Sequence, residues 1–176
     1  MRYEQAQSIE SVQNGLEGQG YFPSEGLASA IFLAISLQRP IFLEGEPGVG
    51  KTEVAKVLSS WLDTDLIRLQ CYEGLDASHA IYEWDYSKQL LHLRTTEASG
   101  RAKQIDEKAL EDELYNQRFL VRRPRLQAID HGGETPPVLL IDELDRADDE
   151  FEAFLLELLS DYSITIPEIG AFKATA

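Results

Sequence analysis

The sequence predicts an α/β fold in which a mostly parallel sheet carries helices on both faces. Apolar runs of strand length occur at 41–43, 66–69 and 138–141, and helical periodicity fills much of the chain between and after them. Strands that alternate with helices along a chain form parallel sheets, because each return segment has to cross a face of the sheet. At 176 residues the chain can enclose one sizeable core, and a second core is not expected.

The first half of the chain divides into five expected segments. Residues 1–20 are polar and contain several glycines, so we expect a flexible lead-in. A helix is predicted over 24–37, with a serine as its N-cap. A short buried strand is predicted at 41–43 and a second strand at 66–69. Between them, residues 51–62 have the apolar spacing of a helix with one buried face.

The second half has weaker local signals. Aromatic and acidic residues alternate from residue 82, and the following apolar residues predict a hairpin over 82–93. Residues 101–117 are charge-rich and helix-forming, and the continuous apolar run at 138–141 predicts a strand buried on both faces. A one-faced helix is expected over 151–159, followed by a short strand and a turn within 163–170.

The charge of the chain restricts its partners. Sixteen Lys and Arg against 31 Asp and Glu give a net charge of −15, which disfavours nucleic acid and anionic lipid as partners. The single cysteine, Cys71, excludes an intramolecular disulfide and is expected in the core. The start of the chain is polar, and the longest apolar stretch, 27–37, is too short to span a bilayer, so we expect a cytoplasmic protein.

A glycine-rich loop directly after the first expected strand is the clearest chemical motif. It consists of Gly45, Glu46, Pro47, Gly48, Val49, Gly50, Lys51 and Thr52. Its glycines allow several backbone N–H groups to point at one centre, and the helix that follows adds the positive end of its dipole. Lys51 is expected to reach the β- and γ-phosphates, and the Thr52 hydroxyl to bind magnesium. The loop therefore predicts binding of a purine nucleoside triphosphate, ATP, with Mg²⁺.

Two acidic residues follow the apolar run at 138–141. Ligands of open α/β sheets bind at the carboxyl ends of the strands, where this run delivers Asp142 and Glu143. Asp142 is expected to hold the magnesium beside Thr52. Glu143 is placed to polarise the attacking water as a general base. With Lys51, Glu143 is the predicted catalytic residue of an ATPase.

These motifs together resemble a known family. Residues 45–52 and 138–143 look like the Walker A and Walker B motifs of AAA+ ATPases. Further stretches resemble the MoxR family, at 69–75, 142–147 and 151–157, and its CoxD-like branch, at 82–86 and 120–126.

The resemblance implies a three-layer P-loop NTPase (AAA+) core, with a partial nucleotide-binding domain at 21–176 and an insertion at about 82–130. It also implies a homo-oligomeric ring of the hexamer type that remodels a protein client. The CoxD-like branch is associated with metal-cofactor maturation of molybdenum hydroxylases. Tyr21-Phe22-Pro23 would lie against adenine, although a core role for these aromatics is equally open. The expected hairpins at 82–93 and 162–172 resemble insertions that contact clients or neighbouring subunits, the alternative being core aromatics.

The family pattern continues with a sensor strand, an arginine finger and a helical lid, so we expect a core truncated before these elements. In the family's sheet order the sensor strand lies between 41–44 and 138–142, and we expect the isolated chain to hydrolyse ATP poorly. The arginines at 122, 123, 125 and 146 are candidates for subunit contacts or for ordinary pairing with carboxylates. The histidines at 79, 92 and 131 lack metal-ligand spacing.

Other functions remain open on the sequence alone. A nucleotide-gated binding module would use the same loop without appreciable hydrolysis. A phosphotransferase is disfavoured by the Asp142-Glu143 pair, and a nucleic-acid-dependent ATPase by the net charge of −15.

Overall fold

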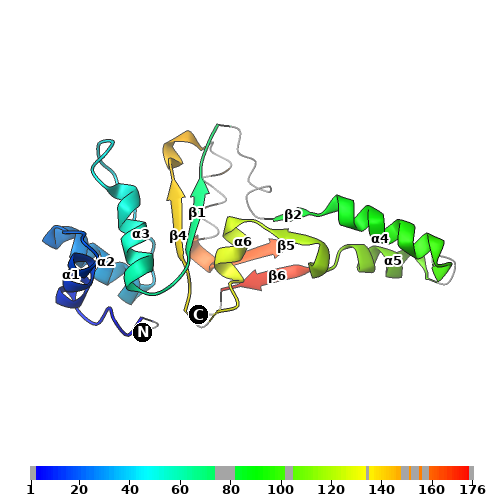
Figure 1. Ribbon diagram of the computed structural model, residues 1–176, viewed down its shortest axis with the longest axis horizontal. Helices are drawn as coiled ribbons and strands as arrows, with labels where there is room; N and C mark the ends of the chain where they lie inside the picture. The colour runs from blue at the N-terminus through cyan, green and yellow to red at the C-terminus, as the bar shows by residue number, and fades with distance from the viewer. Residues whose placement is uncertain are drawn as a thin grey trace.

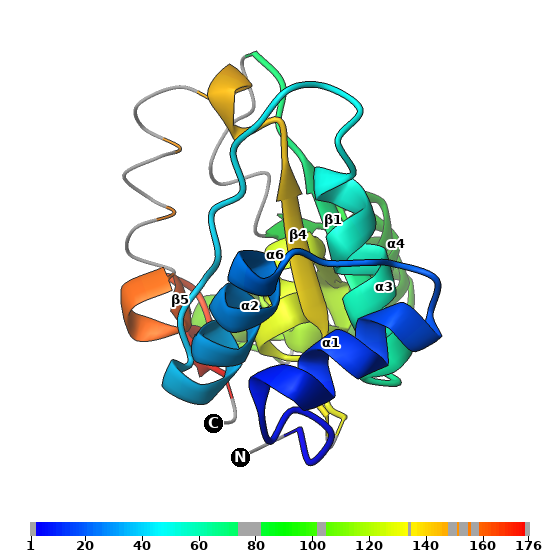
Figure 2. The same cartoon turned by 90° about the vertical axis from the view of Figure 1, so that its left-hand side faces the viewer.

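A parallel two-stranded ladder lies at the centre of the computed structural model (Figure 1). The structure describes residues 3–73, 82–101, 105–133, 135–147, 151, 155 and 159–174. β1 (Leu66–Gln70) pairs with β4 (Val138–Asp142), and their ends meet with Gln70 beside Asp142. α3 (Lys51–Trp61) packs on one face of this ladder and α6 (Pro124–Ile129) on the other (Figures 1 and 2). The expected α/β class, with a parallel sheet between helical layers, is confirmed.

One helical layer is made by α1 (Ile9–Gly18), α2 (Glu25–Leu37) and α3. The predicted helices over 24–37 and 51–62 are confirmed with nearly the expected bounds. The Ser24 side chain accepts a hydrogen bond from the Leu27 N–H and so caps α2. Buried apolar residues join the three helices into one cluster, namely Ala6, Val12, Leu16, Ala28, Ile31, Val54 and Val57.

α1 differs from the flexible lead-in expected at 1–20. The hydroxyls of Ser8 and Ser11 form a capping box that satisfies the N–H groups at the start of the helix. Val12 and Leu16, four residues apart on one face, are fully buried against the neighbouring helices. The polar composition of the segment hid these two positions, through which the helix packs on the core.

The predicted buried strand at 41–43 does not form. This segment pairs with no strand in the described part of the chain, and the Phe42 side chain is 74% exposed. Among the described residues, β4 pairs with β1 alone, which leaves its other edge open. A strand needs a neighbouring strand, because its backbone N–H and C=O groups form their hydrogen bonds with that neighbour. With a strand on one side alone among the described residues, every residue of β4 is half-buried, and not buried on both faces as expected.

The opposite layer contains α6 and a hairpin of β5 (Ser163–Ile166) and β6 (Gly170–Lys173). The predicted strand and turn within 163–170 are confirmed. The cluster on this side includes Cys71, which is fully buried as expected. Phe151 and Leu155, from the helix expected at 151–159, are also helical and buried there, whereas 152–154 and 156–158 lie outside the described residues.

An elongated arm extends from this side of the molecule (Figure 1). Its helices are α4 (Tyr86–Ala98) and α5 (Glu107–Leu114), the latter within the helix-forming stretch expected at 101–117. The hairpin predicted over 82–93 is wrong. β2 (Tyr82–Trp84) is a strand, but it pairs with β3 (Leu120–Arg122), and α4 occupies the expected return strand. Asp85 caps α4 through the Lys88 N–H, a start signal that the alternating aromatics obscured.

The seam between the two arm helices is polar. Gln89 is buried in α4, and its side-chain amide donates to the Leu114 carbonyl at 2.8 Å. The His92 ring lies 3.0 Å from the Glu113 carboxylate, and this hydrogen bond holds the pKa of Glu113 below its ordinary value. Polar contacts in the seam therefore hold α4 on the rest of the arm.

Among the residues that the structure describes, none of the helices combines the length and the apolar character that a membrane span requires.

Candidate nucleotide site

The glycine loop keeps the backbone shape that its glycines allow. Gly48 and Gly50 have φ of 85° and 91°, in the left-handed region that side chains disfavour. Gly50 is the N-cap residue of α3, and it has no side chain to accept a hydrogen bond from the first turn. The first N–H groups of a helix have no partner within it, so this turn presents donors and a positive dipole end to an anion.

Lys51 folds back onto its own loop. Its ammonium group donates to the carbonyl oxygens of Gly45 and Glu46, the second at 2.8 Å. These carbonyls hold a positive charge over the loop. A phosphate would offer the ammonium charged acceptors, which form stronger hydrogen bonds than carbonyls do.

The structure brings Thr52 and Asp142 together, although 90 residues separate them. The Thr52 hydroxyl lies 3.3 Å from the Asp142 Oδ2, since the start of α3 faces the carboxyl end of β4. Magnesium prefers oxygen ligands, and a hydroxyl and a carboxylate at this separation fit two neighbouring positions around it. The described residues contain no cluster of three or more His, Cys, Asp or Glu side chains able to hold a metal, so this hydroxyl–carboxylate pair would need the phosphate oxygens to complete the magnesium shell.

A third side chain reaches the same carboxylate. The Arg68 guanidinium lies 2.8 Å from the Asp142 Oδ2 and 2.7 Å from the Gln70 side-chain oxygen, both through Nη2. The register of β1 against β4 causes this contact, because it sets Gln70 opposite Asp142 with Arg68 two residues earlier on the same face. The sequence analysis missed Arg68. The available signal was the alternation of Arg68 and Gln70 with apolar residues in a strand that ends at the site.

Glu143 lies at the turn that follows β4. Its backbone is left-handed, with φ of 55° and ψ of 45°, and its N–H donates to the Asp142 Oδ1 at 3.1 Å. Its carboxylate pairs with the Arg146 guanidinium at 3.0 Å, and both side chains are largely exposed. A left-handed non-glycine residue is uncommon and costs conformational energy, and such residues concentrate at functional sites.

The two aromatic residues that precede α2, Tyr21 and Phe22, lie in different environments. The Tyr21 ring packs on the core of α1, α2 and α3, and its edge lies 3.7 Å from where a Cβ on Gly50 would stand. Phe22 is 79% exposed. The structure thus places Tyr21 beside the glycine loop and leaves Phe22 on the surface.

Two of the remaining arginine candidates form ion pairs within the chain. Arg122 pairs with Asp130 at 2.8 Å, and Arg123 pairs with Glu83. The side chain of Arg125 and all of His79 lie outside the described residues. The arginines that are described therefore meet carboxylates within the chain, one of the two readings that the sequence left open.

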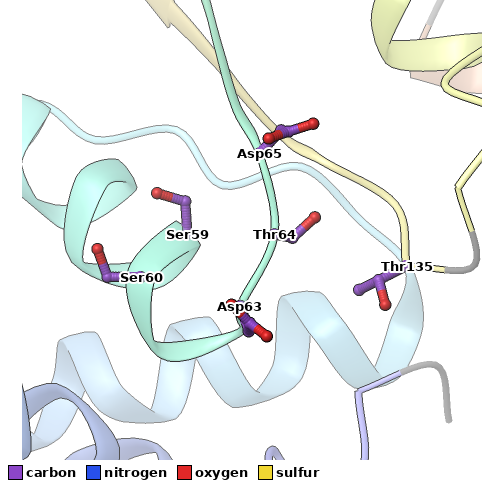
Figure 3. Close-up of a pocket in the computed structure, with 6 residues that line it drawn as sticks. All are labelled: Ser59, Ser60, Asp63, Thr64, Asp65 and Thr135. Carbon is purple, nitrogen blue, oxygen red and sulfur yellow. The ribbon is translucent and has the colours of Figure 1, made fainter.

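A depression of about 390 Å³ lies at the other end of α3 (Figure 3). It is lined by Ser59, Ser60, Asp63, Thr64, Asp65 and Thr135. The figure shows these side chains at the end of α3 and at the entries to β1 and β4, without a common centre. Ligands of parallel sheets bind at the carboxyl ends of the strands, and this depression lies at the amino ends. We therefore assign the glycine loop, and not this depression, as the candidate site.

Comparison with known proteins identifies a family. The model of a domain family described as the AAA domain (dynein-related subfamily) matches residues 40–172. The match begins just before the glycine loop and includes Asp142 and Glu143. No curated protein and no solved structure matches the sequence.

Proposed function

The chain belongs to the AAA family, in its dynein-related subfamily, and on that basis we propose that it binds Mg-ATP at residues 45–52 and hydrolyses it with Glu143 as general base. Membership of this family supports nucleotide binding and ATPase activity in general. The observation that carries the assignment to particular residues is the contact of Thr52 with Asp142 at 3.3 Å, beside the glycine loop.

In the proposed complex, the N–H groups of the loop and the first turn of α3 bind the phosphates. Lys51 leaves the carbonyls of Gly45 and Glu46 and pairs with the β- and γ-phosphates. Thr52 and Asp142 would hold magnesium, which neutralises phosphate charge when bound. Positioning and charge stabilisation provide most of the catalysis in phosphoryl transfer, so these residues need little further chemistry.

In this proposal Glu143 is the general base. Its carboxylate would accept the proton of the water that attacks the γ-phosphorus. The carboxylate now pairs with Arg146, and a swing of either side chain would free it. Because both side chains are largely exposed, the pair is weak and the exchange costs little.

The finer family assignment belongs to the same proposal. We assign the chain to the MoxR-type ATPases on the stretches at 69–75, 142–147 and 151–157, and to their CoxD-like branch on the stretches at 82–86 and 120–126. As such it would act in a homo-oligomeric ring on a protein client, and molybdenum hydroxylases are the clients associated with that branch.

The proposal is tested by calorimetry with ATP and Mg²⁺. Wild type should bind, and Lys51→Ala and Thr52→Ala should each lose tight binding, because the first removes the phosphate cation and the second a magnesium ligand. Lys56→Ala is the matched control, since Lys56 lies five residues along α3 and pairs with Glu53 on the surface. Equal affinity of wild type and both loop variants would overturn the assignment.

A second candidate is a nucleotide-gated binding module without appreciable turnover. In that case the Glu143 carboxylate would stay paired with Arg146 when nucleotide binds and would not act as a base. Glu143→Gln separates the two functions, because it keeps the shape of the side chain and removes the base. Loss of hydrolysis with retained ATP binding supports the ATPase. Absence of hydrolysis by wild type that nevertheless binds ATP supports the binding module.

A further inference from the structure

The Arg68 guanidinium forms an ion pair with the Asp142 carboxylate. Asp142 Oδ2 receives the Arg68 Nη2 at 2.8 Å and the Thr52 hydroxyl at 3.3 Å, whereas Oδ1 receives the Glu143 N–H. The Asp142 side chain is 20% exposed, so few directions of approach to Oδ2 remain. The oxygen on which the proposed function depends for magnesium is thus the one that the guanidinium contacts.

The position of Arg68 is fixed from two sides. The register of β1 against β4 sets its backbone opposite Leu140, and its Nη2 also donates to the Gln70 side chain at 2.7 Å. Its own side chain is 53% exposed, and water is therefore available to receive the guanidinium if it leaves. A pair of this kind is weak enough to exchange and strong enough to compete.

From these contacts we propose that Arg68 is an internal counter-ion that competes with magnesium for Asp142. The inference rests on the proposed function. Without nucleotide, Arg68 neutralises Asp142 and holds the end of β1 against the end of β4. When Mg-ATP binds, the Arg68 guanidinium leaves Asp142 Oδ2. The free energy needed to break this ion pair lowers the affinity of the site for magnesium. Arg68 is a positioning residue, because it acts on the site through Asp142.

The linkage between magnesium and ATP tests this role. The measured quantity is the Kd for ATP in EDTA divided by the Kd in saturating Mg²⁺, obtained from fluorescence titration with a labelled ATP. Arg68→Gln should raise this ratio about threefold to fivefold, the equilibrium factor expected for an ion pair of this exposure. Arg68→Lys keeps the charge and should leave the ratio near that of wild type.

Arg94→Gln is the matched control. It removes an arginine from the exposed face of α4, where the structure gives that side chain no partner among the described residues, and the ratio should not change. An unchanged ratio in Arg68→Gln would overturn the inference and leave the nucleotide site standing. Equal weakening in both buffers would also overturn it, because Arg68 would then contact the nucleotide directly. Failure of wild type to bind ATP in either buffer would instead sink the proposed function, and this inference with it.

Discussion

Gly50→Ala tests the geometry of the glycine loop most directly. Gly50 has φ of 91° and ψ of 15°, and a left-handed backbone costs an alanine about 1–2 kcal/mol. A Cβ at this position would lie 3.7 Å from the Tyr21 ring, an ordinary contact, so no steric term is added. The lower backbone entropy of unfolded alanine offsets about 0.5 kcal/mol, which leaves a net loss of about 0.5–1.5 kcal/mol.

The assay is thermal unfolding followed by ATP titration. A loss of this size lowers the Tm of a chain of this length by about 2–5 °C. If the loop relaxes to avoid the strain, its N–H groups no longer converge, and ATP affinity falls about tenfold for each 1.4 kcal/mol lost.

Gly26→Ala is the control for this measurement. Gly26 lies in α2 without a left-handed backbone, and a Cβ there would meet nothing within 4 Å. Alanine is the better helix former, so this variant should gain about 0.5–1 kcal/mol. A Gly50→Ala protein as stable as wild type, beside a stabilised Gly26→Ala, would refute the left-handed conformation of the loop.

Two further predictions concern packing and pH. A Cβ on Gly15 would overlap the Trp61 ring, so Gly15→Ala should cost about 1–3 kcal/mol in urea unfolding; Gly18→Ala on the same helix, with nothing within 4 Å, should be tolerated. Equal stability of these two variants would contradict the packing of α1 on α3. The hydrogen bond with His92 lowers the pKa of Glu113 from 4.5, so the ionised carboxylate stabilises the arm above that pH, and the contribution is lost as pH falls through the lowered value. Glu113→Gln should therefore lower the Tm at pH 7, and this difference should vanish as the pH falls below the lowered pKa of Glu113; a difference that persists there would contradict the role of the charge.

The elements that the sequence predicted correctly are those set by local pattern. α2 and α3 have a start signal and an apolar face within a single segment. β1 and β4 are apolar runs that find each other as parallel partners. The positions of Thr52 and Asp142 follow from these elements, because the loop precedes α3 and the acidic pair ends β4.

The elements that it missed depend on distant residues. A ladder partner decides whether residues 41–43 become a strand, and the described chain provides none. β2 finds its partner in β3 and not in the nearby apolar residues, which α4 uses instead. Arg68 reaches Asp142 through strand register, a relation that no single segment contains.

In the described part of the chain one edge of β4 has no strand partner, and this has a consequence for handling the protein in solution. Exposed strand edges template pairing with other chains, and mutual repulsion between like-charged molecules opposes such encounters. A net charge of −15 provides this repulsion near neutral pH, and it disappears at the isoelectric point of about 4.5. Colloidal stability should therefore fall steeply on acidification or in high salt, which screens the charge to a few ångströms. Buffers of neutral pH and low ionic strength will best keep the molecules apart.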